Sequence, residues 1–133
     1  MNQQSRKPKS DMRVAEEILR QLGGREFATV TGSHSFISDG NTLRMCLAKN
    51  QSGANRLFIT YRPHPDDYKL RFFYYKAPYI KGVPELRKIV EVPEVEKDIE
   101  VFKGVYCDML RPIFEDVTGF VTRMPKIIFT NGS

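Results

Sequence analysis

The feature that most constrains the fold is a change in hydrophobic period at the glycine pair Gly23-Gly24. Before this pair, apolar residues recur every three or four positions, which is the spacing of a helix with one buried face. After it, apolar and polar residues alternate as far as residue 76, which is the spacing of strands with one buried face. The chain therefore has to pack helix against sheet.

The first helix is expected over residues 11–22. Its apolar stripe consists of Val14, Ala15, Ile18, Leu19 and Leu22. Ser10 or Asp11 can cap its N-terminus, and the glycine pair supplies the positive φ that ends a helix. Residues 1–10 are polar and basic and contain a proline, so we expect them to form a flexible basic arm.

Two hairpins are expected to follow and to form an antiparallel meander of four strands. Residues 27–31 already have the β-branched and aromatic composition of a strand. The first hairpin turns at Asp39-Gly40, because glycine accepts the positive φ that tight hairpin turns require. After a polar loop at residues 49–55, the second hairpin runs through 56–62 and 68–76.

The second half of the chain is less regular. Prolines and a glycine interrupt residues 77–100, which we interpret as an irregular insertion with a short helix over 85–91. A second helical stripe contains Phe102, Tyr106, Met109, Leu110, Ile113 and Val117. Pro112 lies within it, and either kinks the helix or sits in its first turn if the helix starts late. Residues 126–130 are expected to form a short strand or an extended segment.

Helices segregated from an antiparallel sheet define an α+β, two-layer fold. We expect a four-stranded antiparallel sheet packed against an N-terminal and a C-terminal helix, with the irregular insertion before the last helix. The chain has 133 residues and 15.4 kDa, which fits one domain, placed at residues 11–133.

The sequence predicts a cytoplasmic protein without disulfides. No apolar run approaches the roughly 20 residues of a membrane-spanning helix. The basic N-terminus has no apolar segment behind it, so it does not read as a secretory signal. Cys46 and Cys107 lie far apart in a chain without such a signal, and we expect both to be reduced thiols.

No catalytic, metal or cofactor site emerges from the sequence. Ser33-His34-Ser35 places hydroxyls beside an imidazole, but neighbours on a strand point to opposite faces. The cysteines and histidines lack the close spacing of zinc ligands. His64 with Asp66 and Asp67 reads as a tight turn rather than a cation site. Glycine-rich phosphate loops are absent, so we expect a non-enzymatic protein with no cofactor and no metal.

Basic and aromatic residues occur together on the second hairpin, which suggests nucleic-acid binding. The formal net charge is +5 and the basic excess lies in the first two-thirds of the chain. Single-stranded DNA or RNA binds to positive grooves with aromatic rings on which bases stack. The predicted binding residues are Arg56, Tyr61, Arg62, Lys69, Arg71, Phe73, Tyr75 and Lys76.

Two other interpretations remain open at this stage. A charge of +5 is ordinary for a small soluble domain, and the rings can pack beneath the acidic insertion. Aromatic and arginine residues are also enriched at protein interfaces. The alternative function is therefore a protein–protein interaction module, such as an inhibitor of a host factor or a homodimer. The sequence does not fix the oligomeric state.

Several short motifs occur together in order. The chain opens with Ile18-Leu19-Arg20-Gln21-Leu22-Gly23-Gly24, continues through Thr31-Gly32, 38–43 and 53–56, and closes with 104–110, Ile113-Phe114 and Thr118-Gly119. This order resembles a family of short uncharacterised bacteriophage and prophage proteins. The resemblance covers about residues 12–76 and 101–122, implies a phage or mobile-element origin in a host cytoplasm, and brings no established activity. The chain departs from the pattern at 1–10, at 77–100, at Pro112 and after Arg123.

Overall fold

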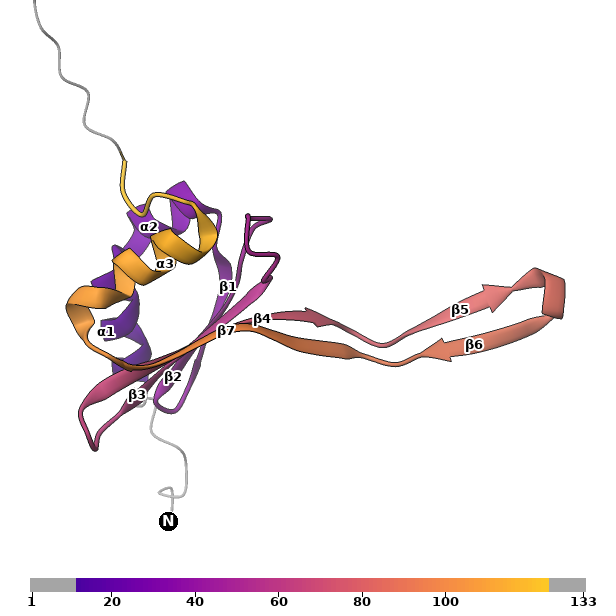
Figure 1. The fold of residues 1–133 in the computed structure, drawn as a ribbon, viewed down its shortest axis with the longest axis horizontal. Coiled ribbons are helices and arrows are strands. Elements are labelled where there is room, and N and C mark those ends of the chain that lie inside the picture. The colour runs from indigo at the N-terminus through magenta and orange to yellow at the C-terminus, as the bar shows by residue number, and fades with distance from the viewer. Residues whose placement is uncertain (1–11, 125–133) are drawn as a thin grey trace, which may run out of the picture.

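The computed structural model describes residues 12–124, so the predictions for residues 1–10 and 126–130 lie outside the described part of the chain. The helices are α1 (Met12–Leu22), α2 (Gly24–Thr31) and α3 (Leu110–Thr118). The main sheet contains β1 (His34–Asp39), β2 (Thr42–Cys46), β3 (Arg56–Arg62), β4 (Asp67–Lys76) and β7 (Val95–Val105), in the order β1-β2-β3-β4-β7. All four pairings are antiparallel (Figure 1).

The α+β class and the two expected hairpins are confirmed, but the sheet has five strands and not four. Its alternating residues bury one face against the helices. The innermost side chains from the sheet are Leu57, Ile59, Leu70 and Phe72, and those from the helices are Ile18, Leu22, Phe27, Leu110 and Phe114; all are fully buried. The rings of Phe27 and Phe114 meet edge to face at 4.9 Å, which joins α2 to α3.

The expectation of a strand at residues 27–31 is wrong, because these residues belong to α2. The glycine pair bends the chain, with Gly23 at a φ of 127°, and a new helix starts directly after it. Phe27 and Thr31 are four residues apart, so a helix places both on one side, where both are buried. The Thr31 hydroxyl donates to the Phe27 carbonyl at 2.8 Å. Burial of the Phe27 ring overrides the strand propensity of its neighbours.

The irregular insertion and its short helix at 85–91 are also wrong. Residues 77–94 form a long hairpin from β5 (Tyr79–Val83) and β6 (Lys88–Val92), which pair with each other as a separate two-stranded sheet. Only a single 3-10 turn, Pro84–Leu86, links them. The rest of the insertion continues as β7 and pairs with β4.

The last helix starts late, as one of the two alternatives for Pro112 requires. Phe102 lies in β7, and a 3-10 turn at Cys107–Met109 precedes α3. Pro112 is therefore the third residue of α3, in the first turn, where a backbone N–H has no intrahelical partner in any case. The proline is therefore compatible with the start of α3. The first two residues of the predicted helical stripe, Phe102 and Tyr106, are not helical.

Two smaller expectations can be compared with the described residues. Cys46 and Cys107 are free thiols, half-buried and exposed respectively. Within residues 12–124, no helix is long and apolar enough to cross a lipid bilayer.

The reassignment of residues 27–31 gives a first testable prediction. We expect Phe27→Ala to lower the free energy of unfolding by about 3–5 kcal/mol, because it removes a fully buried ring. Thr29→Ala, on the exposed side of the same helix, should change it by less than about 0.5 kcal/mol. Urea denaturation of both variants measures the difference. Similar small effects at both positions would contradict the helical assignment.

Candidate functional site

The first candidate site is the sheet face turned away from the helices, called here the open face. Cross-strand pairing aligns Arg44, Phe58 and Arg71 on this face. Around them lies a shallow hollow of about 490 Å³, whose further lining includes Ile37, Cys46, Arg56, Phe73, Tyr75 and Glu96. Five of the eight predicted nucleic-acid-binding residues therefore lie together on the open face. Four of them line the hollow, namely Arg56, Arg71, Phe73 and Tyr75. The fifth, Lys69, lies on the same face, opposite Thr60.

Arg62 also lies on the open face, but its charge is committed within the chain. Its guanidinium donates to both carboxylate oxygens of Asp67, at 2.7 and 2.9 Å. Asp67 is almost completely buried. These hydrogen bonds, more than the opposing effect of desolvation, hold the pKa of Asp67 below its ordinary value. The pair closes the β3–β4 turn and leaves little free positive charge there.

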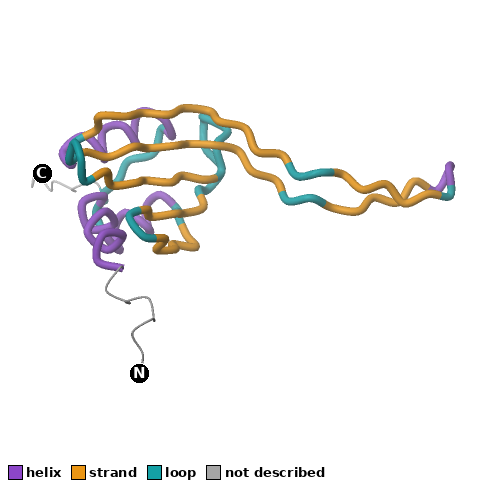
Figure 2. The backbone as a smooth tube through the Cα atoms, turned by 90° about the horizontal axis from the view of Figure 1, so that it is seen from below, coloured by secondary structure: helices purple, strands orange, loops and turns teal. Residues whose placement is uncertain are grey.

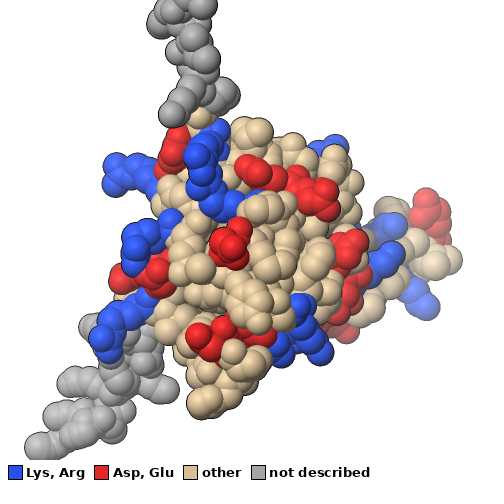
Figure 3. Space-filling model, turned by 60° about the vertical axis from the view of Figure 1, so that its left-hand side comes forward, with Lys and Arg blue, Asp and Glu red and all other residues tan. Residues whose placement is uncertain are grey.

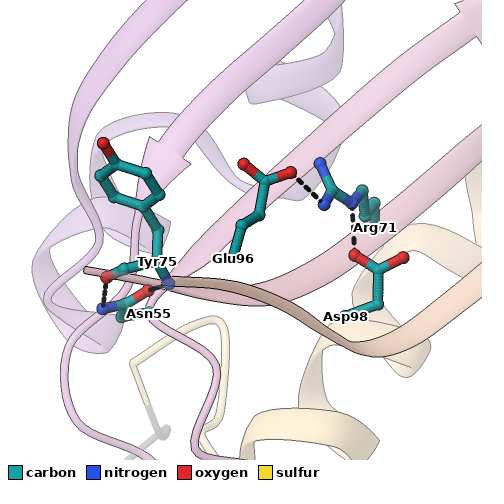
Figure 4. A network of polar contacts seen from close by, with 5 residues as sticks. All are labelled: Asn55, Arg71, Tyr75, Glu96 and Asp98. Atoms are coloured by element: carbon teal, nitrogen blue, oxygen red, sulfur yellow. Dashed lines mark hydrogen bonds and ion pairs between the residues drawn. The ribbon is translucent and has the colours of Figure 1, made fainter. Parts of the chain in front are cut away.

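Arg71 is held between two acidic side chains of β7 (Figure 4). Its Nε donates to Asp98 Oδ1 at 2.7 Å and its Nη2 donates to Glu96 Oε2 at 2.6 Å. Burial by itself would lower the pKa of Arg71, but the two hydrogen bonds outweigh it and raise that pKa. The acidic residues of the insertion therefore neutralise Arg71 from the neighbouring strand and do not fold across the open face.

The aromatic rings of the open face are covered by arginines. The guanidinium carbon of Arg71 lies 3.9 Å from the ring centre of Phe73, and that of Arg44 lies 4.7 Å from Phe58. Phe73 retains only 3% of its accessible surface. Arg56 covers Tyr75 in the same way at 5.4 Å. A nucleobase would have to displace these cation–π contacts before it could stack on the rings.

The remaining predicted residues are dispersed. Tyr61 lies on the helix side of the sheet, paired with the buried Tyr68, and its hydroxyl donates to Asp66 at 2.5 Å. This hydrogen bond raises the pKa of the Tyr61 phenol. Lys76 ends β4 and lies over the ring of Tyr79 at 4.7 Å. The structure thus separates Tyr61 and Lys76 from the other six residues.

The second candidate site is the hairpin arm, defined as residues 77–94. It leaves the body of the molecule where β4 and β7 extend beyond β3. Both views show that it projects away from the helices and from the main sheet (Figures 1 and 2). With about nine residues on each side, it extends by about 30 Å. Sequence reasoning missed it, although two Val- and Ile-rich runs around a four-residue turn are a hairpin signal.

The hairpin arm exposes large apolar side chains. Ile80 is 70% exposed, Leu86 62% and Ile89 75%, which makes Ile89 and Ile80 the most exposed large hydrophobic residues among those described. None of the buried core residues lies between 77 and 94. The arm therefore contributes nothing to the core of the molecule, and its apolar surface faces solvent.

The root of the hairpin arm is firmly held, as Figure 4 shows. The Asn55 side chain donates through Nδ2 to the Tyr75 carbonyl and accepts from the Tyr75 amide through Oδ1, both at 2.8 Å. Asn55 directly precedes β3, which begins at Arg56, so its side chain continues the hydrogen bonding between β3 and β4 beyond the start of β3. The Tyr75 hydroxyl donates to Glu94 at 3.2 Å. Burial and the Glu94 carboxylate raise the pKa of the Tyr75 phenol.

Neither the charge on one side of the molecule nor the grouping of possible metal ligands indicates a further site among the described residues. Figure 3 shows acidic side chains distributed among the basic ones, with no broad basic field on that side of the molecule. Within residues 12–124, no three His, Cys, Asp or Glu side chains are grouped so that they could hold a metal ion. The expectation that the protein has no metal or cofactor remains a prediction.

The role of Asn55 can be tested by hydrogen exchange. We expect Asn55→Ala to speed exchange of the Tyr75 amide roughly tenfold, because two hydrogen bonds of about 0.5–1.5 kcal/mol each are lost. Asn41→Ala, in the exposed β1–β2 turn, should leave that amide unchanged. Equal protection of Tyr75 in both variants would show that Asn55 does not hold the root.

Comparison with known proteins gives no relative from which a function can be transferred. No family model, no curated protein and no solved structure matches the chain. The resemblance to bacteriophage proteins therefore stays a prediction. The function has to be argued from the geometry of the open face and of the hairpin arm.

Proposed function

We propose that this protein is a non-enzymatic accessory protein that acts as a protein–protein interaction module, with the hairpin arm as the part that contacts the partner. The observation that carries the proposal is the solvent exposure of Ile80, Leu86 and Ile89 on an element that stands away from the body. A phage or mobile-element setting is what the motif resemblance implies. The absence of catalytic activity remains a prediction.

Exposed apolar side chains on a protruding hairpin favour a protein partner on energetic grounds. Burying an isoleucine side chain contributes roughly 1.5–3 kcal/mol, so three such side chains supply much of a specific contact. A two-stranded ribbon by itself is only marginally stable in water, and a contact that covers one of its faces would stabilise it. Contiguous exposed apolar surface commonly marks an interaction site.

The charge of the hairpin arm supports the same assignment. Lys81, Arg87 and Lys88 are balanced by Glu85, Glu91 and Glu94, so three basic and three acidic residues give a net charge of zero. A nucleic-acid-binding arm would need an excess of cations to neutralise phosphates. A neutral, apolar arm is better suited to a protein surface.

The root supports the proposal because it orients the arm. The paired hydrogen bonds of Asn55 hold β4 to the chain just before β3. The two carboxylates on Arg71 hold β4 to β7, close to the point where the arm begins. An interaction element that is already ordered loses less conformational entropy when it binds.

Photo-crosslinking in producing cells tests the proposal. A photoreactive residue at Ile89 should form adducts with protein, whereas one at Ile37, which is 52% exposed on the open face, should not. A variant in which Asn-Gly replaces residues 77–94 should lose the interaction and keep its thermal midpoint. That turn can join β4 to β7 because Lys76 and Val95 are direct partners. Absence of protein adducts at Ile89 would reject the proposal.

Single-stranded nucleic acid is the second candidate partner. It is favoured by Arg56 and Lys69, which lie on the open face and make no ion pair with the described residues. Arg56 also lines the hollow. The proposal is weaker because the rings are covered and the other cations of that face are largely paired.

Nucleic-acid binding, if it occurs on the open face, should be weak and strongly salt-dependent. A labelled single-stranded oligonucleotide should bind at about 50 mM salt and be released as salt rises, because phosphate contacts displace counterions. Arg56→Gln should weaken binding several-fold, whereas Arg25→Gln, an exposed arginine in α2, should not. Fluorescence anisotropy measures both. No binding at about 50 mM salt would reject this candidate.

A further inference from the structure

One face of the hairpin arm combines a prominent apolar residue with a notch. The strand register pairs Gly82 with Ile89 and Ile80 with Glu91, so these four residues share one face. The other face carries Lys81 opposite Val90. On the first face, the 75% exposed side chain of Ile89 stands directly beside the position where Gly82 has no side chain.

Nothing within residues 12–124 explains a glycine at position 82. Seven glycines in residues 12–124 adopt positive φ, and Gly82 is the only described glycine that does not. A Cβ added to Gly82 would meet no atom within 4 Å. Glycine in a strand costs roughly 0.5–1 kcal/mol relative to alanine, so its presence here needs another cause. A strand glycine of this kind often marks the close approach of another molecule.

We propose that two copies of this protein pack their hairpin arms face to face, with Ile89 of each copy filling the notch above Gly82 of the other. This inference rests on the proposed function, because both take the hairpin arm as a protein-binding element. The two copies are related by a two-fold axis that lies between the packed faces and runs parallel to the arms. This rotation places β5 of one copy over β6 of the second. Because Gly82 and Ile89 are directly opposite each other, the rotation places Ile89 of each copy over Gly82 of the other, so the contact forms twice.

The same operation accounts for the other pair on this face. It places Ile80 over the aliphatic part of Glu91 of the second copy, at a position where the carboxylate can still reach solvent. The arm is neutral overall, so two copies meet without net repulsion. A two-fold interface requires a patch that is complementary to itself. Ile89 beside the notch at Gly82 satisfies this requirement.

The size of this face sets the expected strength of the contact. Five paired rows of β5 and β6 extend by about 16 Å along the strands, and two strands are about 10 Å wide, so this face covers roughly 160 Å². That is well below the roughly 800 Å² per partner of a stable complex. We therefore expect a reversible dimer that forms only at high concentration, in which Ile89 provides the main anchor.

Sedimentation equilibrium of the full chain tests the inference between about 1 µM and 1 mM protein. The average mass should rise with concentration from 15.4 kDa toward twice that value. Gly82→Val fills the notch, and a Cβ at this position meets no atom of the monomer within 4 Å, so this variant should remain monomeric and folded. Lys81→Val introduces the same side chain at the neighbouring position on the opposite face and should dimerise as the unmodified chain does.

A second matched pair tests the apolar anchor. Ile89→Ser should abolish dimerisation, and Val90→Ser, on the opposite face, should weaken it less than threefold. Circular dichroism checks that all four variants are folded. A mass of 15.4 kDa at every concentration, or dimerisation of Gly82→Val equal to that of the unmodified chain, would overturn the inference.

The crosslinking result separates this inference from the proposed function. Adducts at Ile89 with a different protein, together with a monomeric chain in the centrifuge, would leave the proposed function standing and overturn the face-to-face dimer. Adducts between two copies that disappear in Gly82→Val support both. If Ile89 forms no adducts with any protein and the chain remains monomeric, both proposals fail.

Discussion

The rest of the structure depends on the pairing of β4 with β7. These strands contain ten and eleven residues, whereas β3 has seven and β2 five. Because β4 extends beyond β3, the last residues of β4 and the first residues of β7 pair with each other without a neighbouring strand. The chain between them continues as the two-stranded hairpin arm. The hairpin arm thus begins where the strand lengths become unequal.

This pairing also explains why the basic and aromatic residues of β4 are covered. Glu96 and Asp98 enter the sheet from the acidic insertion and lie beside Arg71, which in turn covers Phe73. Ion pairs this exposed contribute about 1 kcal/mol or less each, so they do little for global stability. Their effect is on register, since sliding β7 by one residue would turn both carboxylates to the other face. Much of the positive charge on this hairpin therefore serves the fold.

The sequence predicts the parts of this fold that local signals determine. The stripe of α1 and the Asp39-Gly40 turn are such signals, because each requires only nearby residues. The errors lie where one spacing fits two structures. Phe27 and Thr31 suit a strand by composition and a helix by position, and only the core contact of Phe27 with Phe114 decides between them. Phe102 and Tyr106 have helical spacing, yet Phe102 pairs with Leu70 in the sheet.

The candidate site was predictable only in part, for a related reason. The residues of the open face could be located from alternation, but their ion pairs could not, because the partners of Arg71 lie 25 and 27 residues further along the chain. Gly82 shows the opposite case. Before the register of β5 and β6 is known it is one of several turn-like signals in the insertion. Once the register places it opposite Ile89 with an ordinary strand φ, it becomes the one described glycine that the fold does not need. Because glycine destabilises a strand and neither space nor φ requires it at position 82, the reason for Gly82 is to be sought in a contact with another molecule.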